Sequence, residues 1–232
     1  KLFSGYRPME LVLPSLYSEI EGPALPKIVE ELSRVNYLSH ITIGLDRATR
    51  AEFDKAKNFF SKLNIPHTVI WNDGPKVKQL LSELEDSGLN LGEPGKGRNV
   101  WTCVGYVLAR GKAEVLALHD CDILTYKREL LGRLLFPIAN PNFQFEFCKG
   151  YYARVGQGKL NGRVSRLLIG PLLAALESNI GYSDYLNFMK SFRYPLSGEF
   201  ALRSNLLSDL RIPFDWGLEM GILSEMYRNQ AI

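Results

Sequence analysis

The sequence is poor in cysteine and has no long apolar run. Its 232 residues include three cysteines, Cys103, Cys121 and Cys148, at spacings that fit no metal motif. An odd and sparse set argues against a disulfide framework and indicates a reducing compartment, so we expect a cytoplasmic protein. No apolar run approaches the roughly 20 residues that a membrane-spanning helix needs.

The chain also has little excess charge. Its formal net charge of +3 is too small to indicate nucleic-acid binding, although it is compatible with a small phosphorylated substrate. A hydrophobic fraction of 46% is that of an ordinary globular protein with a sizeable core. The chain begins at Lys1 rather than at a methionine and shows no secretory leader, so we expect a fragment that lacks its native termini.

Short apolar runs alternate with amphipathic stretches in the first half. The expected strands cover residues 9–14, 40–46, 67–71 and 114–120. The expected helices cover residues 23–35, 50–63, 76–88 and 97–111. This alternation predicts an α/β protein with a mostly parallel, Rossmann-like sheet flanked by helices, whose ligands bind beyond the carboxyl ends of the strands.

The second half has a different pattern. Residues 142–155 alternate phenylalanine with other residues and predict one strand, and residues 194–204 predict another. Residues 164–176 predict a helix that Pro171 should kink or divide. Residues 217–229 predict a last helix. Without repeats or a low-complexity linker, we expect a single domain.

Two carboxylates follow the buried run Val115–Leu118, at Asp120 and Asp122. Two adjacent like charges destabilise a fold unless something positive lies between them. The motif alone favours a strand-end turn, since aspartate readily forms turns. Its position at the ligand-bearing edge, which Asp46 shares, instead suits a divalent cation such as Mg²⁺ bound to a diphosphate. Both interpretations stay open.

Two glycine-containing segments are candidate anion sites. Lys96 lies between Gly95 and Gly97 directly before a helix, which indicates an anion site or, equally, a flexible loop with a solvated lysine. Arg163 and Ser165 begin the helix after Gly162 and could bind a phosphate or carboxylate. For that second segment, the residues alone favour a helix capped by Asn161 or Ser165, with Arg163 in solvent.

Other polar residues carry less information on their own. Glu199 follows Ser197 and Gly198, while Glu219 lies on an amphipathic helix, where a lone glutamate is usually solvated. His119 precedes Asp120, but no other histidine accompanies it, because His40 and His67 lie at the starts of predicted strands.

In combination, these segments resemble a known family. The order "LVLPSLYSE", "ITIGLD", "GKGRNVW", "HDCDI", "FCKGYYAR", "LNGRVSRLLIGPLLAAL", "YPLSGEFALR" and "WGLEMGILSEMY" is similar to that of retaining GT-A glycosyltransferases. The similarity is to the enzymes that transfer a hexose to 3-phosphoglycerate. It implies the GT-A fold, with a nucleotide-binding half over about residues 1–125 and a smaller acceptor-binding half over about residues 126–232. It also implies a homodimer. The small net charge and the short apolar runs predict neither nucleic-acid partners nor a membrane span.

The resemblance implies roles for individual residues. Those matching the donor-nucleotide site are Pro14, Ser15, Leu16, Glu19, Asp46, Lys96, Asp120 and Cys121. Those matching the acceptor loop are Gly162, Arg163, Val164 and Ser165, and those lining the sugar region are Leu196, Gly198 and Glu199. The implied catalytic residues are Asp120, Asp122, Glu199 and Glu219, with Asp122 as the ligand of a Mg²⁺ or Mn²⁺ cofactor.

This chain departs from the family pattern in three places. His119 stands where a plainer residue is expected, and Ser165 stands where threonine is common. The third metal ligand of the family is a histidine beyond the last matched helix, and no such histidine occurs before Ile232. We therefore expect that ligand in a tail outside these 232 residues.

The expected reaction is transfer of glucose from UDP-glucose to 3-phosphoglycerate with retention at the anomeric carbon. No residue is a convincing sugar nucleophile, so we expect front-face attack, assisted by the departing diphosphate. The alternatives are a mannosyl transferase that uses GDP-mannose, a non-catalytic nucleotide-sugar-binding module, and an α/β interaction domain. A dehalogenase-like phosphatase is remote, because its Asp-X-Asp normally lies on the first strand.

Overall fold

The first half of the chain forms nine elements, which are four strands of the central sheet and five helices. The computed structural model describes residues 1–152, 155–156, 159–160, 162–215 and 217–230. The elements of the first half are β1 (Met9–Leu16), α1 (Tyr17–Ile20), α2 (Leu25–Ser33), β2 (Leu38–Asp46), α3 (Arg50–Phe60), β3 (His67–Trp71), α4 (Pro75–Asp86), α5 (Lys96–Arg110) and β4 (Val115–Leu118). The alternation predicted from the sequence is confirmed here.

The second half adds mostly helices, with short strands between them. Its helices are α6 (Arg128–Ala139), the π-helix η1 (Ser165–Ile169), α7 (Gly170–Ile180), α8 (Asp184–Ser191), the 3₁₀-helix η2 (Ser204–Asp209) and α9 (Leu218–Gln230). Its strands are β5 (Phe147–Lys149), β6 (Val155–Gly156), β7 (Lys159–Leu160) and β8 (Phe200–Arg203). Pro171 lies at the start of α7, so the predicted division of that helix is confirmed.

The main sheet has six strands in the order β3-β2-β1-β4-β8-β5. Strands β1 to β4 pair in parallel, whereas β8 runs antiparallel to both β4 and β5. The mostly parallel sheet is therefore confirmed, and the antiparallel strand β8 inserts the second half of the chain into it.

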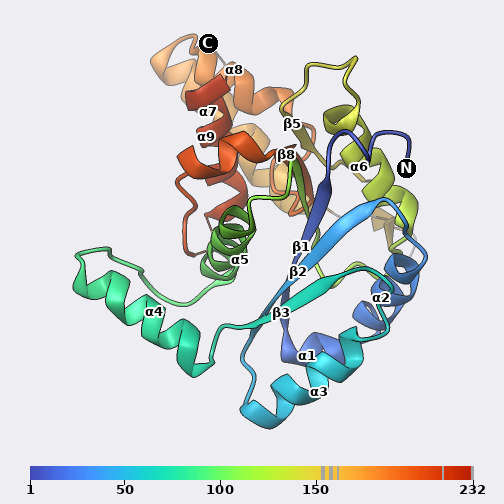
Figure 1. Cartoon of the computed structure of the whole chain (residues 1–232). Coiled ribbons are helices and arrows are strands. Elements are labelled where there is room, and N and C mark those ends of the chain that lie inside the picture. The colour runs from blue at the N-terminus through green and yellow to red at the C-terminus, as the bar shows by residue number, and fades with distance from the viewer. Residues whose placement is uncertain (153–154, 157–158, 161, 216, 231–232) are drawn as a thin grey trace.

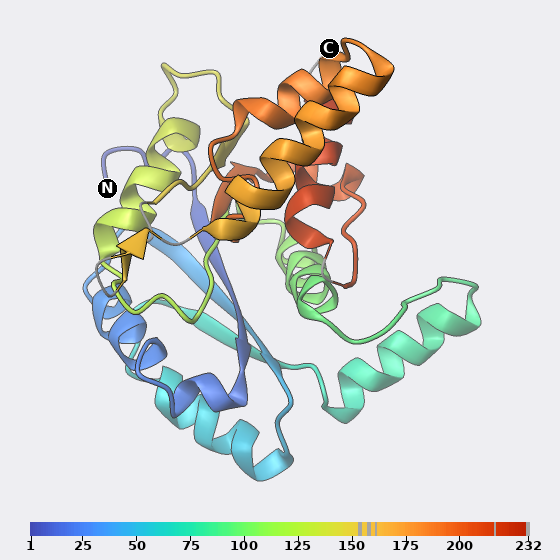
Figure 2. The same cartoon turned by 180° about the vertical axis from the view of Figure 1, so that it is seen from behind.

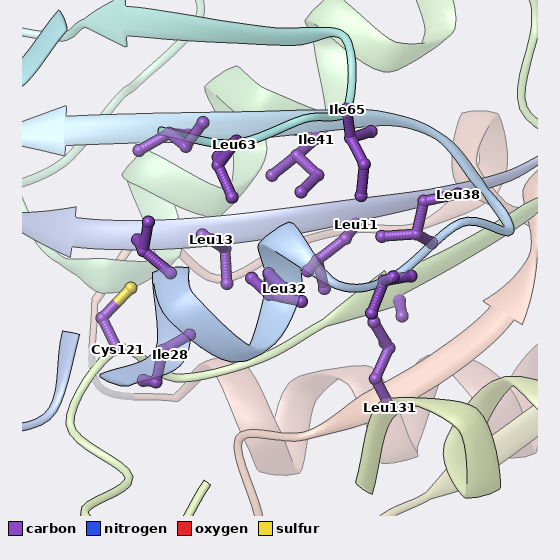
Figure 3. Packing of buried hydrophobic residues seen from close by; sticks show 14 of the residues in the cluster. Leu11, Leu13, Ile28, Leu32, Leu38, Ile41, Leu63, Ile65, Cys121 and Leu131 are labelled. Atoms are coloured by element: carbon purple, nitrogen blue, oxygen red, sulfur yellow. The ribbon is translucent and has the colours of Figure 1, made fainter. Parts of the chain in front are cut away.

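Helices cover both faces of the sheet, because the strands are apolar on both faces. On β1, Leu11 and Leu13 pack in one core cluster with α2, and Val12 packs in the other with α5. Figure 3 shows Leu11 and Leu13 facing Ile28 and Leu32 of α2. Figures 1 and 2 show α1 to α3 with α6 on one side, and α5 with α7 to α9 on the other. The chain thus forms a helix–sheet–helix sandwich.

Helix α4 is the exception to this covering arrangement. It projects from the body of the molecule (Figure 1), and none of its residues is buried.

Two sequence predictions were wrong in extent. Within residues 142–152 of the strand expected over residues 142–155, only Phe147–Lys149 is a strand, because its partner β8 has only four residues to pair with. Residues 153–154 lie outside the described residues, and Val155 belongs to β6. Phe143 instead stacks edge-on against Phe136 of α6, with ring centroids 5.8 Å apart. The strand expected over residues 194–204 is likewise limited to β8. Helices α6 and α8 were not predicted.

Candidate active site at the carboxyl edge of the sheet

Strand register brings the predicted site residues to one edge. The parallel strands β1, β2 and β4 all end there. Ser15 and Asp46 therefore lie at the ends of β1 and β2, and Asp120 follows β4. The antiparallel partner β8 begins at this edge, since Phe200 pairs with Leu118 of β4 and with Lys149 of β5. Residues that precede β8 therefore meet residues that follow β4.

Lys96 is the centre of the charge cluster at this edge. Its Nζ lies 2.6 Å from Asp120 Oδ1 and 2.8 Å from Glu219 Oε1. Burial alone would lower the pKa of Lys96, but the two carboxylates outweigh burial and hold that pKa above its ordinary value. The interpretation of Lys96 as a solvated loop lysine is therefore wrong. The positive partner of Asp120 in this structure is a lysine from the chain itself.

The glycines on either side of Lys96 serve the packing of the chain. A Cβ on Gly97 would lie 1.7 Å from the Pro213 carbonyl oxygen, and one on Gly95 would lie 2.8 Å from the Phe214 carbonyl oxygen. The Arg98 amide donates to the same Phe214 oxygen at 3.0 Å. We expected these glycines to admit a ligand. Their lack of a side chain instead allows close approach of the backbone that leads into α9, and this contact brings Glu219 to Lys96.

The Asp-X-Asp segment divides between the site and the core. A Cβ on Gly198 would lie 2.2 Å from Asp120 Oδ2, so only glycine leaves room for this carboxylate. Asp122 is exposed, whereas the Cys121 side chain is buried in the core cluster (Figure 3). The Cys121 side chain thus belongs to the core, and the exposed carboxylate of Asp122 does not share that position.

His119 is a core residue here. It is fully buried, and its ring packs edge-on against Tyr126 at a centroid distance of 5.4 Å. Burial lowers the pKa of His119 to about 4, so the imidazole is neutral. Neither ring nitrogen hydrogen-bonds to any described residue, which gives no support to a histidine–aspartate metal pair.

The first two strands contribute further acidic groups. Glu19, in α1, accepts a hydrogen bond from the Leu16 amide at 2.8 Å. Burial raises the pKa of Glu19, and the nearby carboxylates of Asp122 and Asp120 raise it further. At the end of β2, Asp46 accepts a hydrogen bond from Asn72 Nδ2 at 2.7 Å, while burial raises its pKa. The edge is thus strongly acidic, except at Lys96 and at one further lysine.

That further lysine, Lys149, was missed by the sequence analysis. It ends β5, and its Nζ donates to the Ser197 carbonyl oxygen at 2.7 Å. Burial lowers the pKa of Lys149 to about 8, an effect that the charges of Glu219 and Glu199 only partly offset. A lysine at a strand end carries no signal in the sequence. Only the pairing of β5 with β8 brings this ammonium group to the site.

The Ser197–Glu199 segment is buried beside Lys149. The Ser197 hydroxyl donates to Glu199 Oε2 at 2.5 Å, and both residues are almost inaccessible to solvent. Leu196, before them, is half-buried. A buried carboxylate that accepts from a hydroxyl is oriented by that bond, so Glu199 has a fixed direction in the site.

The predicted acceptor segment lies next to this one. Gly162 has a φ of 91°, a conformation that favours glycine, and a Cβ there would lie 3.6 Å from the Tyr194 ring. The Tyr194 carbonyl oxygen in turn accepts from the Ser197 amide at 3.2 Å. Arg163 and Val164 are exposed, and Ser165 is buried. The proposed cap residue Asn161 lies outside the described residues.

The described residues contain neither a larger metal-binding cluster nor a membrane-spanning helix. No group of three or more His, Cys, Asp or Glu side chains among them could hold a metal ion. None of the helices in the described part of the chain is long and apolar enough to cross a membrane.

Comparison with known proteins decides the relationship. No protein-family model matches the chain. The glucosyl-3-phosphoglycerate synthase of Persephonella marina is 52% identical over 231 residues, which are 100% of this chain and 57% of that protein. The synthase of Methanococcoides burtonii is 42% identical over 226 residues, which are 96% of this chain and 55% of that protein. The chain is a homologue of these synthases.

A solved glucosyl-3-phosphoglycerate synthase confirms the fold. The crystal structure from Mycobacterium tuberculosis, in complex with Mn²⁺, uridine diphosphate and glucosyl-3-phosphoglycerate, matches with a TM-score of 0.68 and 21% identity. The match covers 98% of this chain and 67% of that one. The predicted GT-A fold is thus confirmed. The chain spans a little over half the length of the two curated synthases it matches.

Proposed function

We propose that this chain binds UDP-glucose and transfers its glucose to 3-phosphoglycerate with retention, as part of a glucosyl-3-phosphoglycerate synthase. The observation that carries the proposal is the cluster in which Lys96 joins Asp120 and Glu219 at the carboxyl edge of a GT-A sheet. The homologues at 52% and 42% identity bear the name of this activity. Related structures hold Mn²⁺ with UDP-glucose and phosphoglyceric acid.

The donor nucleotide would lie across the ends of β1, β2 and β4. The residues assigned to it are Pro14, Ser15, Leu16, Glu19, Asp46, Lys96, Asp120 and Cys121. Because the Cys121 side chain is buried in the core, only its backbone is available to a ligand. Lys96 and Lys149 supply the positive charge that a diphosphate requires in this otherwise acidic edge.

The donor set fits a metal ion only in part. Asp122 offers an exposed carboxylate, whereas Asp120 is paired with Lys96. Mg²⁺ is usually bound by one or two carboxylates together with substrate phosphates and water, so Asp122 with a diphosphate would be sufficient to hold one. When bound, such an ion would neutralise the charge that develops on the leaving diphosphate.

The acceptor would lie between the acceptor loop and the Ser197–Glu199 segment. Gly162, Arg163, Val164 and Ser165 would hold the phosphoglycerate, with the exposed guanidinium of Arg163 on its phosphate. Leu196, Gly198 and Glu199 would line the sugar. The contact from Gly162 through Tyr194 to Ser197 supports this placement, because it puts the two segments side by side.

Retention would follow from front-face attack. Glu199 is oriented by Ser197, and Glu219 is paired with Lys96, so each carboxylate already has a partner. We propose that both position the sugar and the diphosphate, so that preorganised charge supplies most of the rate. A glycosyl-azide product formed by Glu199→Ala or Glu219→Ala with added azide would show instead that a carboxylate is the nucleophile.

We propose further that the chain is a single domain, with a nucleotide half and an acceptor half that meet near residue 125. The two core clusters that flank the sheet contain residues from each half, such as Leu13 with Ala201, and Val12 with Phe200. A third, smaller cluster of Leu173, Leu186, Met189 and Leu223 lies wholly in the second half. The sparse cysteines support a cytoplasmic location, and a homodimer remains part of the proposal.

The test is calorimetric titration of UDP into the chain with Mn²⁺, repeated with EDTA. We expect binding that EDTA weakens at least tenfold and that Asp122→Asn weakens similarly, while Asp86→Asn on the projecting helix α4 leaves it unchanged. Product formation from UDP-glucose and 3-phosphoglycerate, followed by mass spectrometry and NMR of the anomeric proton, then tests transfer. A folded chain that binds no UDP would refute the proposal.

A non-catalytic nucleotide-sugar-binding module is the second candidate. The observation that favours it is the absence of a three-residue metal cluster among the described residues. Binding of UDP without turnover of UDP-glucose would identify this function.

A further inference from the structure

A second pocket lies at the opposite end of the sheet from the candidate active site. It has a volume of about 680 Å³ and is lined by Pro8, Ser39, His40, Pro66, His67, Arg110 and Lys112. These residues come from the amino-terminal ends of β1, β2 and β3 and from the end of α5. Lys96 and Arg110 mark the two ends of α5, so about 20 Å of helix separates the two sites.

The lining of this pocket is basic. Arg110, Lys112 and two histidines face it, and no carboxylate belongs to the lining. An acidic group beneath it, Glu10, is fully buried and lies 3.3 Å from Arg110 Nη2. Because the charge of Glu10 neutralises that of Arg110, the pocket keeps the positive charge of Lys112.

The polar network beneath the pocket is incomplete. Arg110 Nη1 lies 3.2 Å from His40 Nε2, and because a guanidinium can only donate, Nε2 accepts and the proton of His40 is on Nδ1. That Nδ1–H and Arg110 Nε–H are both buried without a hydrogen-bond partner among the described residues. Two acceptors, Glu10 Oε2 and Thr42 Oγ1, are also unpartnered. Buried polar groups normally find partners, so unpaired donors beneath a basic pocket indicate a site for a ligand.

His67 completes the arrangement. Its Nδ1 lies 2.9 Å from the Ile65 carbonyl oxygen and must donate to it, which fixes the ring. In the neutral ring, Nε2 is then an acceptor, and in the protonated ring it becomes a second donor.

We propose that this pocket binds a small phosphate-bearing anion, held by Arg110 and Lys112 with His67 at its side. Arg110 Nη1 and Nη2 each carry a second N–H beside those directed at His40 and Glu10, so the guanidinium can still donate to a phosphate. A volume of about 680 Å³ lies within the range of small-molecule sites and exceeds what a bare ion fills, which indicates a phosphorylated metabolite. The site differs in place and in residues from the proposed donor and acceptor sites.

The histidines of the chain provide the test. There are three of them, of which His40 and His67 line the pocket and His119 lies next to Asp120. Imidazole resonances of the ¹⁵N-labelled chain, followed by NMR at constant pH and ionic strength, therefore report each site separately. Inorganic phosphate is the probe, and chloride is the reference anion.

We expect phosphate to shift the His40 and His67 resonances saturably at millimolar concentration or below. Lys112→Gln, at an exposed position that should not disturb folding, is expected to weaken this binding at least threefold, and Arg110→Gln at least tenfold. Lys27→Gln removes the same charge from α2, away from the pocket, and should leave the binding unchanged.

Three results would overturn the proposal. One is a shift that grows linearly with phosphate without saturation, or that chloride reproduces. Another is an effect on His119 alone, since it would place the phosphate at the candidate active site. The third is unaltered affinity in Lys112→Gln together with unaltered affinity in a folded Arg110→Gln.

Discussion

Lys96 shows how a single side chain resolves the electrostatic problem of this site. Asp120 and Glu219 come from distant parts of the chain, and each would repel the other if Lys96 were absent. The three side chains are 17% to 30% exposed, so water screens these charges only in part. Lys96 therefore has a structural role in the free protein, beside its proposed role toward the nucleotide.

Replacing Lys96 by Met should lower the free energy of unfolding by about 2 kcal/mol at pH 7, because two half-buried carboxylates lose their cation. Urea denaturation at pH 7 measures the effect. Lys57→Met, which removes an exposed ion pair with Asp54, should have no measurable effect. Equal stability of Lys96→Met and the wild type would contradict the structural role.

His40 should make the stability depend on pH. Burial, with Arg110, His67 and Lys112 adding to it, lowers the pKa of His40 from 6.5 to about 4. Below pH 6.5, His40 is protonated in the unfolded chain but stays neutral in the folded chain. Its contribution to the free energy of unfolding is therefore fully present above pH 6.5 and is lost as the pH falls toward 4. The expected loss is about 2 kcal/mol between pH 7 and pH 5.

The comparison with His40→Gln isolates this effect from that of the carboxylates. Glutamine can still accept from Arg110 but does not titrate. The difference in unfolding free energy between wild type and variant, measured by urea denaturation, should therefore shrink from pH 7 to pH 5. A constant difference would show that His40 does not titrate in this way.

At the scale of elements, helix α5 connects the two ends of the molecule. Its first turn packs against residues 213–214, and its apolar face packs through Val100, Cys103 and Val107 against the sheet. The helix ends at Gly111, whose φ of 59° is the left-handed conformation typical of a glycine cap. The position of Lys96 thus depends on how closely the start of α5 approaches the segment that leads into α9.

Two glycines of α5 provide a matched pair of tests. Gly97→Ala would place a Cβ 1.7 Å from a backbone oxygen, so we expect a loss of at least about 2 kcal/mol in the free energy of unfolding, together with weaker UDP binding. Gly105→Ala meets nothing within 4 Å and should stabilise the protein by about 0.5–1 kcal/mol, because alanine favours the helix. Chemical denaturation and calorimetry measure both. Unchanged stability in Gly97→Ala would show that the contact between α5 and residues 213–214 is looser than described.

For the whole molecule, the shared sheet should make unfolding cooperative. Each of the two core clusters that flank the sheet draws residues from both halves of the chain, so neither half can bury the apolar faces of the sheet alone. Trp71 packs against one cluster and Trp101 against the other, which gives each face its own fluorescent reporter.

We expect two variants that each keep a single tryptophan, Trp71→Phe/Trp216→Phe and Trp101→Phe/Trp216→Phe, to show one unfolding transition by fluorescence, coincident with loss of helical circular dichroism. Coincident transitions are the mark of a single cooperative unit. If, in either variant, the fluorescence transition came at a clearly lower urea concentration than the loss of circular dichroism, the single-domain proposal would be wrong.

The sequence by itself determined the parts of this protein that depend on local patterns. Apolar periodicity predicted β1 to β4 and the helices between them, and parallel pairing then placed Asp46 and Asp120 at one edge. Pro171 marked the division between η1 and α7, because a proline cannot donate within a helix. The short motifs also carried the resemblance that led to the GT-A fold.

Only the tertiary structure decided which charges meet. The partners of Lys96 lie 24 and 123 residues away, and the pairing of β5 with β8 that exposes Lys149 to the site has no local signature. The aromatic alternation at Phe143–Phe147 misled for the same reason, since a strand needs a partner of matching length and β8 is short. Long-range packing fixes these contacts, because loop closure and register depend on the whole sheet rather than on neighbouring residues.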